Sequence, residues 1–372
     1  MIENKINIIC NYASEYGGNF IPSLLKFAEI SHDRCDIVFT FPKEAENRYW
    51  AIYLMKLGYK LYFIDSFKKK IKYFKSDICR INKENGINIV LSQFISGLKM
   101  KIIFLFQKKT KLIIHIHSDF SGKKKLSWKA KAKRFIEKHI RNKNTRYIFV
   151  SKQLRDEFGI SKNTFYLPNG ISAFRIPCEK MDLNEFCLKN NIDQNKTIIL
   201  SFGWSPFVKG TDLLVKAFLS LDEKQQKEAT LLIIYGRNNG FETCINYLEQ
   251  QIGNKDFLNN KSIVFASPVK DVFSLYELSD VFVSSSRSEG FSYSLLEAMY
   301  FNLFCISSDI DGVLWSKKYD KCEYYSTEDI ESLSVLLSKY ISFKKEKCFN
   351  QMYLDDFDIR GWAQDLLSIT LG

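Results

Sequence analysis

The chain has 372 residues, of which 46% are hydrophobic, and it carries a formal net charge of +12. This length predicts about two domains, and the apolar content is enough for a packed core in each. The nine cysteines are scattered without a Cys-x-x-Cys pair, which excludes the common zinc and dithiol motifs and favours buried thiols in a reducing compartment. No apolar run approaches the roughly eighteen residues of a membrane-spanning helix, so any membrane contact is expected to be peripheral.

Short apolar runs alternate with amphipathic segments along the whole chain. This alternation predicts an α/β protein with parallel sheets and helices packed on them. Leu214, Ala217 and Phe218, for example, have the i, i+3, i+4 spacing of one helix face. The expected strands are 6–10, 36–40, 60–64, 87–91, 112–116, 147–150 and 164–167 in the first half, and 197–202, 231–235, 262–265, 281–284 and 304–306 in the second.

The least regular part of the chain, residues 168–195, holds two prolines and a polar run. We place the domain boundary there, with a first domain of residues 1–175 and a second of residues 190–357. Both are expected to be doubly wound Rossmann-like domains that face a central cleft, with ligands at the carboxyl ends of their strands. The helical pattern of about residues 358–372 is expected to cross back and pack on the first domain.

The most informative stretch is 288–298, in which Glu289 and Glu297 bracket seven residues. It follows an expected buried strand and precedes an expected helix. The first N–H groups of a helix are unpaired and bind anions, so the two carboxylates can flank a ligand whose phosphates lie on the helix end. The alternative is a capping box from Ser294 to Glu297, with Glu289 as an ordinary solvated loop acid.

A second loop of the same kind follows the strand 197–202, which ends at Gly203. Lys209 lies just ahead of the next helix, which Thr211 or Asp212 can cap. A cation there is repelled by the positive N-terminal end of the helix dipole. A phosphate bound between the cation and the helix end would be attracted by both. The alternative for Lys209 is a solvated loop lysine.

Taken in order, these pieces resemble glycosyltransferase family 4, whose members are retaining GT-B glycosyltransferases. The resemblance is of the bacterial surface-polysaccharide type and covers nearly the whole chain. Its second-half motifs are Gly203, Lys-Gly-Thr-Asp-Leu-Leu at 209–214 with Ala217, the run 279–291, and Glu-Ala-Met at 297–299. Its first-half motifs are Gly17-Gly18, Phe-Val-Ser-Lys at 149–152 and Leu-Pro-Asn-Gly-Ile at 167–171.

The resemblance implies a role for each matching residue. Glu289 would contact the donor sugar at the reacting face, Glu297 would hold the ribose hydroxyls, and Lys209 would bind the diphosphate. Trp204 stands where the family usually has Arg, so another cation, Arg237 or Arg287, would have to substitute, or donor binding would differ. The expected donor-binding residues are Gly17, Gly18, Lys209, Gly210, Val269, Lys270, Ser292, Tyr293, Ser294 and Glu297.

Two of the four histidines, His115 and His117, lie at and just after the end of the expected strand 112–116. Because they are two residues apart, their side chains point to the same face of the strand. The family places a histidine at this strand end near the transferred sugar, so His117 is expected to be catalytic together with Glu289, with His115 as the alternative. The implied mechanism lets the leaving diphosphate help deprotonate the acceptor, and neither a metal nor another cofactor is expected. The one Asp-x-Asp, at 309–311, is typical of a turn.

Sixteen Lys and Arg residues lie within 99–146, opposed by only Asp119 and Glu137. Such a patch favours an anionic partner: membrane headgroups, a pyrophosphate-bearing substrate or nucleic acid. The alternative is a solvated helical face, but Phe135 and Ile136 could dip into a membrane interface. The candidate residues for the acceptor or membrane are Asp119, Lys123, Lys124, Lys125, Trp128, Lys129, Lys131, Lys133 and Arg134.

Together these features predict a retaining, hexosyltransferase-type glycosyltransferase with a nucleotide-sugar donor, expected to be UDP-linked. The expected acceptor is a lipid-pyrophosphate-linked oligosaccharide for a surface polysaccharide such as lipopolysaccharide or capsule. The first residues lack a secretion segment, so the expected location is cytoplasmic, peripheral on the inner face of the cytoplasmic membrane. The alternatives are a glycosyltransferase with a soluble or protein acceptor, a nucleotide-sugar epimerase, and a nucleic-acid-binding protein, which no binding motif supports.

Overall fold

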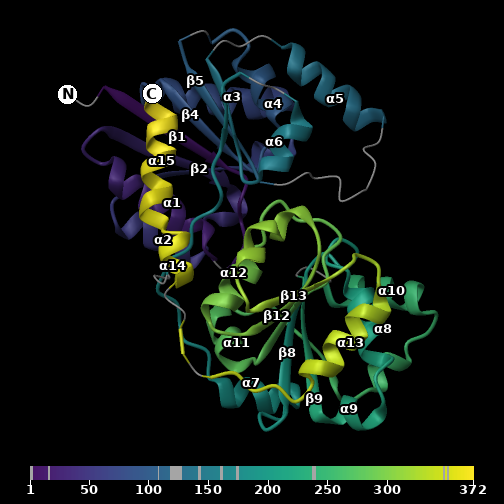
Figure 1. Cartoon of the computed structure of the whole chain (residues 1–372). Helices are drawn as coiled ribbons and strands as arrows, with labels where there is room; N and C mark the ends of the chain where they lie inside the picture. The colour runs from purple at the N-terminus through teal and green to yellow at the C-terminus, as the bar shows by residue number, and fades with distance from the viewer. Residues whose placement is uncertain are drawn as a thin grey trace. The chain divides into compact units, whose positions relative to one another are not determined.

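A computed structural model divides the chain into two compact units, Met1–Pro177 with Phe357–Gly372, and Cys178–Asp356 (Figure 1). Each unit contains its own parallel sheet covered by helices, which confirms the predicted α/β class with two doubly wound, Rossmann-like domains. The structure describes residues 3–15, 17–107, 109–117, 128–140, 144–159, 162–172, 176–236, 240–346, 348–349 and 352–372, without the side chains of 129–131 and 354.

The first unit has a seven-stranded sheet in the order β3-β2-β1-β4-β5-β6-β7, so the strand order reverses between β1 and β4. All seven expected strands are present, with ends that differ from the prediction by two residues at most. The strands are β1 (Asn4–Cys10), β2 (Cys35–Pro42), β3 (Lys60–Ile64), β4 (Ile89–Gln93), β5 (Lys111–Ile116), β6 (Thr145–Phe149) and β7 (Thr164–Tyr166).

Helices cover both faces of this sheet because successive strand residues point to opposite sides. Ile8 packs in one apolar core with α1, α2 and α15, and Ile9 packs in the other with α3, α4 and α6. The C-terminal helix α15 lies beside α1 (Figure 1). The helices are α1 (Phe20–Ser31), α2 (Tyr49–Lys56), α3 (Ile71–Glu84), α4 (Gly97–Phe104), α5 (Trp128–His139), α6 (Lys152–Phe158) and α15 (Ile359–Leu371), with 3-10 turns η1 (Lys43–Ala45) and η2 (Asp65–Lys68).

The second unit has a six-stranded sheet in the order β10-β9-β8-β11-β12-β13, and its strand order reverses between β8 and β11. Five of its strands were expected. The sixth, β13, is a four-residue edge strand that carries a glutamate and two tyrosines, so it lacks the apolar run that marks the others. The strands are β8 (Thr197–Gly203), β9 (Ala229–Tyr235), β10 (Ile263–Ala266), β11 (Val281–Ser284), β12 (Phe304–Ser308) and β13 (Cys322–Tyr325).

The helices α8, α10 and α13 share one apolar core with the second sheet. The second unit's helices are α7 (Leu183–Asn190), α8 (Thr211–Leu219), α9 (Glu223–Glu228), α10 (Gly240–Ile252), α11 (Val272–Leu278), α12 (Tyr293–Tyr300), α13 (Ile330–Tyr340) and α14 (Met352–Asp356), with 3-10 helices η3 (Asp256–Asn259) and η4 (Asp311–Lys318). Among the described residues, no helix combines the length and the hydropathy that crossing a bilayer requires.

Candidate functional site

Two loops of the second unit leave the sheet at the point where its strand order reverses. One follows β8 and leads into α8, and the other follows β11 and leads into α12. In open parallel sheets, ligands bind outside the carboxyl ends of the strands at this switch point. Both stretches that the sequence singled out, around Lys209 and around Glu289, therefore lie at the expected edge of the sheet.

The side chains of these two loops meet in an ion pair between Lys209 and Glu289. The pair is largely shielded from water, with side chains that are 10% and 15% exposed. Ser286 Oγ donates a hydrogen bond of 2.9 Å to Glu289 Oε1. The Lys209 ammonium also lies 5.1 Å from the ring centre of Trp204, whose side chain is mostly exposed. One cation is thus held between a carboxylate and an aromatic face.

Two glycines allow the backbones of this site to approach closely. Gly210 has a φ of +59°, and a Cβ there would lie 1.9 Å from the carbonyl oxygen of Ser285. A Cβ on Gly312 would lie 2.6 Å from the Cβ of Glu289. Gly312 is a site residue that the sequence interpretation missed, because only the tertiary fold brings η4 against this loop.

Arg287, one of the two cations that the sequence suggested as a substitute for the phosphate contact, is engaged within the protein. Its guanidinium donates two hydrogen bonds of 2.8 Å to the carboxylate of Asp212 and one of 2.7 Å to Glu328. Asp212 also does not cap α8, because the N-cap is Gly210, which makes no side-chain capping bond. Arg287 and Asp212 instead tie the two loops together, and the other suggested cation, Arg237, lies outside the described residues.

The helix α12 begins at Tyr293 with Ser292 as its N-cap, whose Oγ accepts a hydrogen bond of 3.4 Å from the Leu295 N–H. The capping box from Ser294 is therefore wrong, because Glu297 lies beyond the third helical position. The Glu297 carboxylate is nearly buried and accepts a hydrogen bond of 2.7 Å from the hydroxyl of Tyr276 on α11. Tyr276 is a second residue that the sequence interpretation did not include.

Val269 and Lys270 lie in the connection between β10 and α11, where Val269 is half-buried and Lys270 is exposed. No hydrogen bond or ion pair within the described part of the chain joins them to Lys209 or Glu289. Their assignment to the donor stays a prediction.

In the first unit, His117 lies just after β5 and is buried. Its Nε2 is 2.6 Å from Oε1 of Gln93, the last residue of β4. The Gln93 amide and the imidazole share one hydrogen bond, and its direction follows the tautomer of the ring. Burial, followed by the neighbouring His115, lowers the pKa of His117 well below its ordinary value, and the imidazole is therefore neutral at pH 7.

His115 differs from His117 in having no polar partner. Neither of its ring nitrogens has a hydrogen-bond partner among the described residues, and burial lowers its pKa to about 3. Its ring packs 4.1 Å from His117 and 6.5 Å from Trp362 of α15, measured between ring centres. These contacts favour a packing role for His115 and leave His117 as the candidate for chemistry.

The Gly17-Gly18 pair lies in the loop between β1 and α1, at the first unit's own switch point. Gly18 has a φ of +53°, and the Gly17 N–H donates to the hydroxyl of Tyr49 at 3.0 Å. Phe20, the first residue of α1, packs edge-on against the His117 ring with centres 5.5 Å apart. The fold therefore brings the glycine loop and His117 to one edge of the first sheet.

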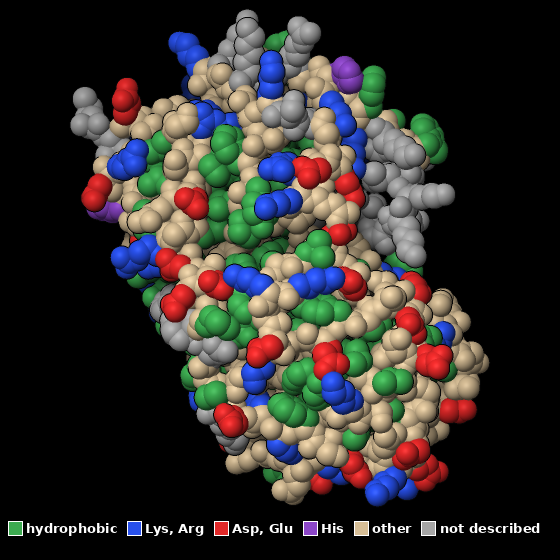
Figure 2. Space-filling view, viewed as in Figure 1, with side chains coloured by type: hydrophobic (Ala, Val, Ile, Leu, Met, Phe, Trp, Pro, Cys, Tyr) green, Lys and Arg blue, Asp and Glu red, His purple; other side chains and the backbone are tan. Residues whose placement is uncertain are grey.

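The predicted basic patch is described in part, because Asp119, Lys123, Lys124 and Lys125 and the side chains of Lys129 and Lys131 lie outside the described residues. On α5, Trp128 is 74% exposed, and Phe135 and Ile136 are exposed as well. Lys133 is exposed beside them, and Arg134 is half-buried against the ring of Phe158. Figure 2 shows Lys and Arg side chains scattered among apolar and acidic ones on the visible face of the first unit.

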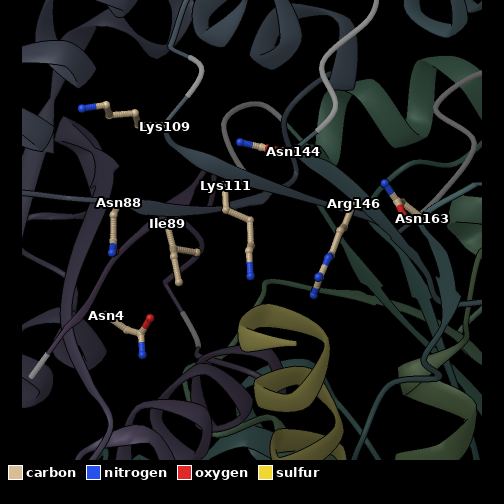
Figure 3. Close-up of a pocket in the computed structure, with 8 residues that line it drawn as sticks. All are labelled: Asn4, Asn88, Ile89, Lys109, Lys111, Asn144, Arg146 and Asn163. Carbon is tan, nitrogen blue, oxygen red and sulfur yellow. The ribbon is translucent and has the colours of Figure 1, made fainter.

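A pocket of about 440 Å³ opens at the amino ends of the first sheet's strands, on the edge away from His117. Lys111 and Arg146 point from it toward the end of α15 (Figure 3). Lys111 donates to the carbonyls of Thr370 and Leu371 at 3.2 and 2.7 Å, and Arg146 donates to that of Ile369. These cations satisfy the last carbonyls of a helix, where the dipole is negative. The pocket is lined by Asn4, Asn88, Ile89, Lys109, Lys111, Asn144, Arg146 and Asn163.

Two Rossmann-like units with these loops define the GT-B class of fold. Residues 184–340 match the family model described as "Glycosyl transferases group 1". The mannosylfructose-phosphate synthase of Agrobacterium fabrum (strain C58 / ATCC 33970) is 26% identical over 187 residues, which is 47% of this chain. The chain matches only 40% of the length of that relative.

Solved structures match over nearly the whole chain. The glycosyltransferase from Rickettsia africae ESF-5 is 16% identical, with a TM-score of 0.73 over 100% of this chain and 98% of that one. Anabaena Alr3699/HepE in complex with UDP and glucose is 15% identical, with a TM-score of 0.74 over 98% and 99%. WaaG, a glycosyltransferase involved in lipopolysaccharide biosynthesis, is 15% identical, with a TM-score of 0.67 over 99% and 100%. The prediction is thus confirmed for the GT-B fold, and the match of residues 184–340 supports a glycosyl transferases group 1 domain in the second unit.

Proposed function

We propose that this protein is a retaining glycosyltransferase of family 4 that takes a hexosyl group from a UDP-linked donor. The observation that carries the proposal is the Lys209–Glu289 pair, which joins the loops leading to α8 and α12 at the switch point of the second sheet. Lys209 and the first N–H groups of α12 suit a diphosphate, and the carboxylates of Glu289 and Glu297 suit sugar and ribose hydroxyls. The complexes of HepE with UDP and with UDP-glucose support this choice of donor.

In the proposed reaction, the bond between the sugar's anomeric carbon and the diphosphate breaks while the acceptor oxygen bonds to that carbon from the same face. The departing diphosphate takes up the acceptor's proton. Lys209 and the amides of α12 stabilise the charge on the diphosphate, and Glu289 orients the sugar. His117 contributes as a neutral hydrogen-bonding group, and the proposal includes no metal or other cofactor.

The donor proposal is tested by thermal unfolding of the purified protein with UDP, GDP, ADP, TDP or CMP, each with and without magnesium. A ligand at 100 times its dissociation constant stabilises a protein by about 2.7 kcal/mol. We expect UDP to raise the melting temperature most, with no dependence on magnesium. A melting temperature that none of the five nucleotides moves would contradict the proposal.

We further propose that the acceptor is a lipid-pyrophosphate-linked oligosaccharide and that the protein works in the cytoplasm, peripherally on the inner face of the cytoplasmic membrane. The support is α5, on which exposed Trp128, Phe135 and Ile136 lie with several cations. Aromatic and aliphatic side chains of such a helix enter the interface, and each cation near an anionic surface adds about 1 kcal/mol. The role of WaaG in lipopolysaccharide biosynthesis is consistent with a lipid-linked acceptor.

Sedimentation with lipid vesicles tests this second proposal. We expect the protein to bind vesicles that contain phosphatidylglycerol but not pure phosphatidylcholine, and Lys133→Glu with Lys138→Glu to weaken that binding. Lys224→Glu with Lys227→Glu, on α9 in the second unit, is the matched control. Equal binding of the double variant and the control would argue for a soluble or protein acceptor. Tighter binding to DNA or RNA than to vesicles would favour the nucleic-acid alternative.

A further inference from the structure

Without a donor, the positive charge of Lys209 is already neutralised by Glu289. Both side chains are mostly shielded, and Ser286 Oγ adds a hydrogen bond to the Glu289 carboxylate. Removing one partner of such a shielded pair leaves the other charge unpaired, which is strongly unfavourable unless a new partner replaces it. A diphosphate that binds Lys209 must therefore compete with Glu289.

Within the two described loops, the second cation is already paired. In the loops 204–212 and 285–292, the cations are Lys209 and Arg287. Arg287 is paired with Asp212 and Glu328, and its side chain is only 10% exposed. Lys209 is thus the cation of these two loops that can turn to a phosphate, and Glu289 already holds it.

The backbones that carry the pair are held in place. Gly210 lies against the carbonyl of Ser285, and Gly312 lies against the backbone of Glu289, too closely in both cases for any Cβ. Ser285 Oγ also donates to the Lys209 carbonyl oxygen at 2.8 Å. A change of partners therefore has to come from rotation of the two side chains and not from opening of the loops.

We propose that donor binding at this site is an exchange of partners, in which Lys209 passes from Glu289 to the diphosphate while Glu289 passes from Lys209 to the sugar hydroxyls. This inference rests on the proposed function. A nucleoside diphosphate without a sugar takes Lys209 but leaves the Glu289 carboxylate without a replacement. The exchange therefore makes the site select the intact donor over the spent nucleotide, and it favours release of the product.

Titration calorimetry on wild type and Glu289→Gln tests the exchange, with UDP, UDP-glucose and inorganic pyrophosphate as probes. A glutamine can still accept from Ser286 and bond to a hydroxyl, but it no longer neutralises the ammonium group. We expect Glu289→Gln to bind UDP and pyrophosphate at least about tenfold more tightly than wild type, since a charge-assisted hydrogen bond no longer competes. The affinity for UDP-glucose should rise less, so the preference for the intact donor shrinks.

Two further variants make the result specific. Glu323→Gln removes a carboxylate that accepts from Lys339 on the same unit, and we expect it to leave all three affinities unchanged. Lys209→Met combined with Glu289→Gln should abolish the gain, because the gain needs the freed ammonium group. Melting curves without ligand show that each variant is folded.

Unchanged or weaker UDP and pyrophosphate binding by folded Glu289→Gln, when wild type binds UDP, would overturn the exchange and leave the donor site intact. Failure of both proteins to bind any nucleotide or pyrophosphate would instead remove the proposed donor site, and the exchange with it.

Discussion

At the scale of single residues, the contact between Gln93 and His117 holds the imidazole at the end of β5. Nε2 of His117 lies 2.6 Å from Oε1 of Gln93, and the ring is neutral because burial lowers its pKa. The sequence gives no local signal that Gln93 and His117 are in contact. This contact depends on β4 lying next to β5, which aligns Gln93 with His115 and places His117 at the same edge.

Gln93→Glu should shift the pH dependence of sugar transfer. A carboxylate at Nε2 stabilises the imidazolium, and an opposite charge at this range raises a pKa by about 1–3 units. We expect the acid limb of the kcat/KM profile to move to higher pH, measured from pH 5 to 9. Gln153→Glu, at a half-buried glutamine of α6, is the control and should leave the profile in place. An unmoved profile for Gln93→Glu would mean that His117 takes no part in the reaction.

Gly312→Ala should weaken donor binding through Glu289. The new Cβ would lie 2.6 Å from the Glu289 Cβ and 2.5 Å from its carbonyl oxygen, so the loop must shift. Overpacking of this kind costs about 1–3 kcal/mol. We expect a lower melting temperature and a weaker affinity for UDP-glucose by calorimetry. Gly240→Ala, whose Cβ has its nearest neighbour at 3.7 Å, should change neither.

At the scale of elements, the sequence predicts strands better than helix ends. Twelve of the thirteen strands follow from apolar runs, because a buried parallel strand needs apolar side chains on both faces. The caps of α8 and α12 were predicted wrongly, since Gly210 takes the left-handed region and Ser292 starts its helix two residues before Ser294. The first residue of each helix depends on how the preceding loop packs against neighbouring elements. A local sequence pattern carries no information about that packing.

The basic helix α5 is anchored to α4 by a buried carboxylate, Glu137. It accepts a hydrogen bond of 3.1 Å from the hydroxyl of Tyr147, and its carboxylate lies so close to Gly97 that a Cβ there would be 2.0 Å from Oε1. Lys101 donates at 2.6 Å to the Glu137 carbonyl oxygen. In the sequence, Glu137 is only one of two acids within a basic run. In the structure, it is the residue through which α5 contacts α4 and β6.

Glu137 should make the stability of the first unit depend on pH. Burial raises its pKa in the folded state above the usual 4.5. A group with a raised folded pKa contributes stability below the unfolded pKa and loses it as pH rises through the folded one. The unfolding free energy of wild type relative to Glu137→Gln should therefore be higher at pH 4.5 than at pH 8, measured in urea. Glu157→Gln, an exposed acid of α6, is the control, and an equal difference at both pH values would contradict the assignment.

At the scale of the whole molecule, the chain closes its first unit with its last helix. Trp362, Leu366 and Leu367 of α15 are part of the apolar core that includes β1 and α1. Lys111 and Arg146 hold the last carbonyls of the helix at the amino edge of the same sheet. The periodicity of 358–372 predicts an amphipathic helix, but the two cations that bind its end belong to β5 and β6, more than two hundred residues earlier in the sequence.

Trp362→Ala should therefore loosen the first unit selectively. Deleting a buried tryptophan side chain costs about 3–5 kcal/mol. Hydrogen exchange followed by mass spectrometry should show faster exchange in β1, β4 and β5, whose residues share this core, while β8 and β11 keep the rates of wild type. Gln364→Ala, on the exposed face of the same helix, should change neither group of strands. Equal acceleration in both sheets would mean that α15 stabilises the molecule as one cooperative body, and no acceleration would mean that α15 is dispensable to the core on which it packs.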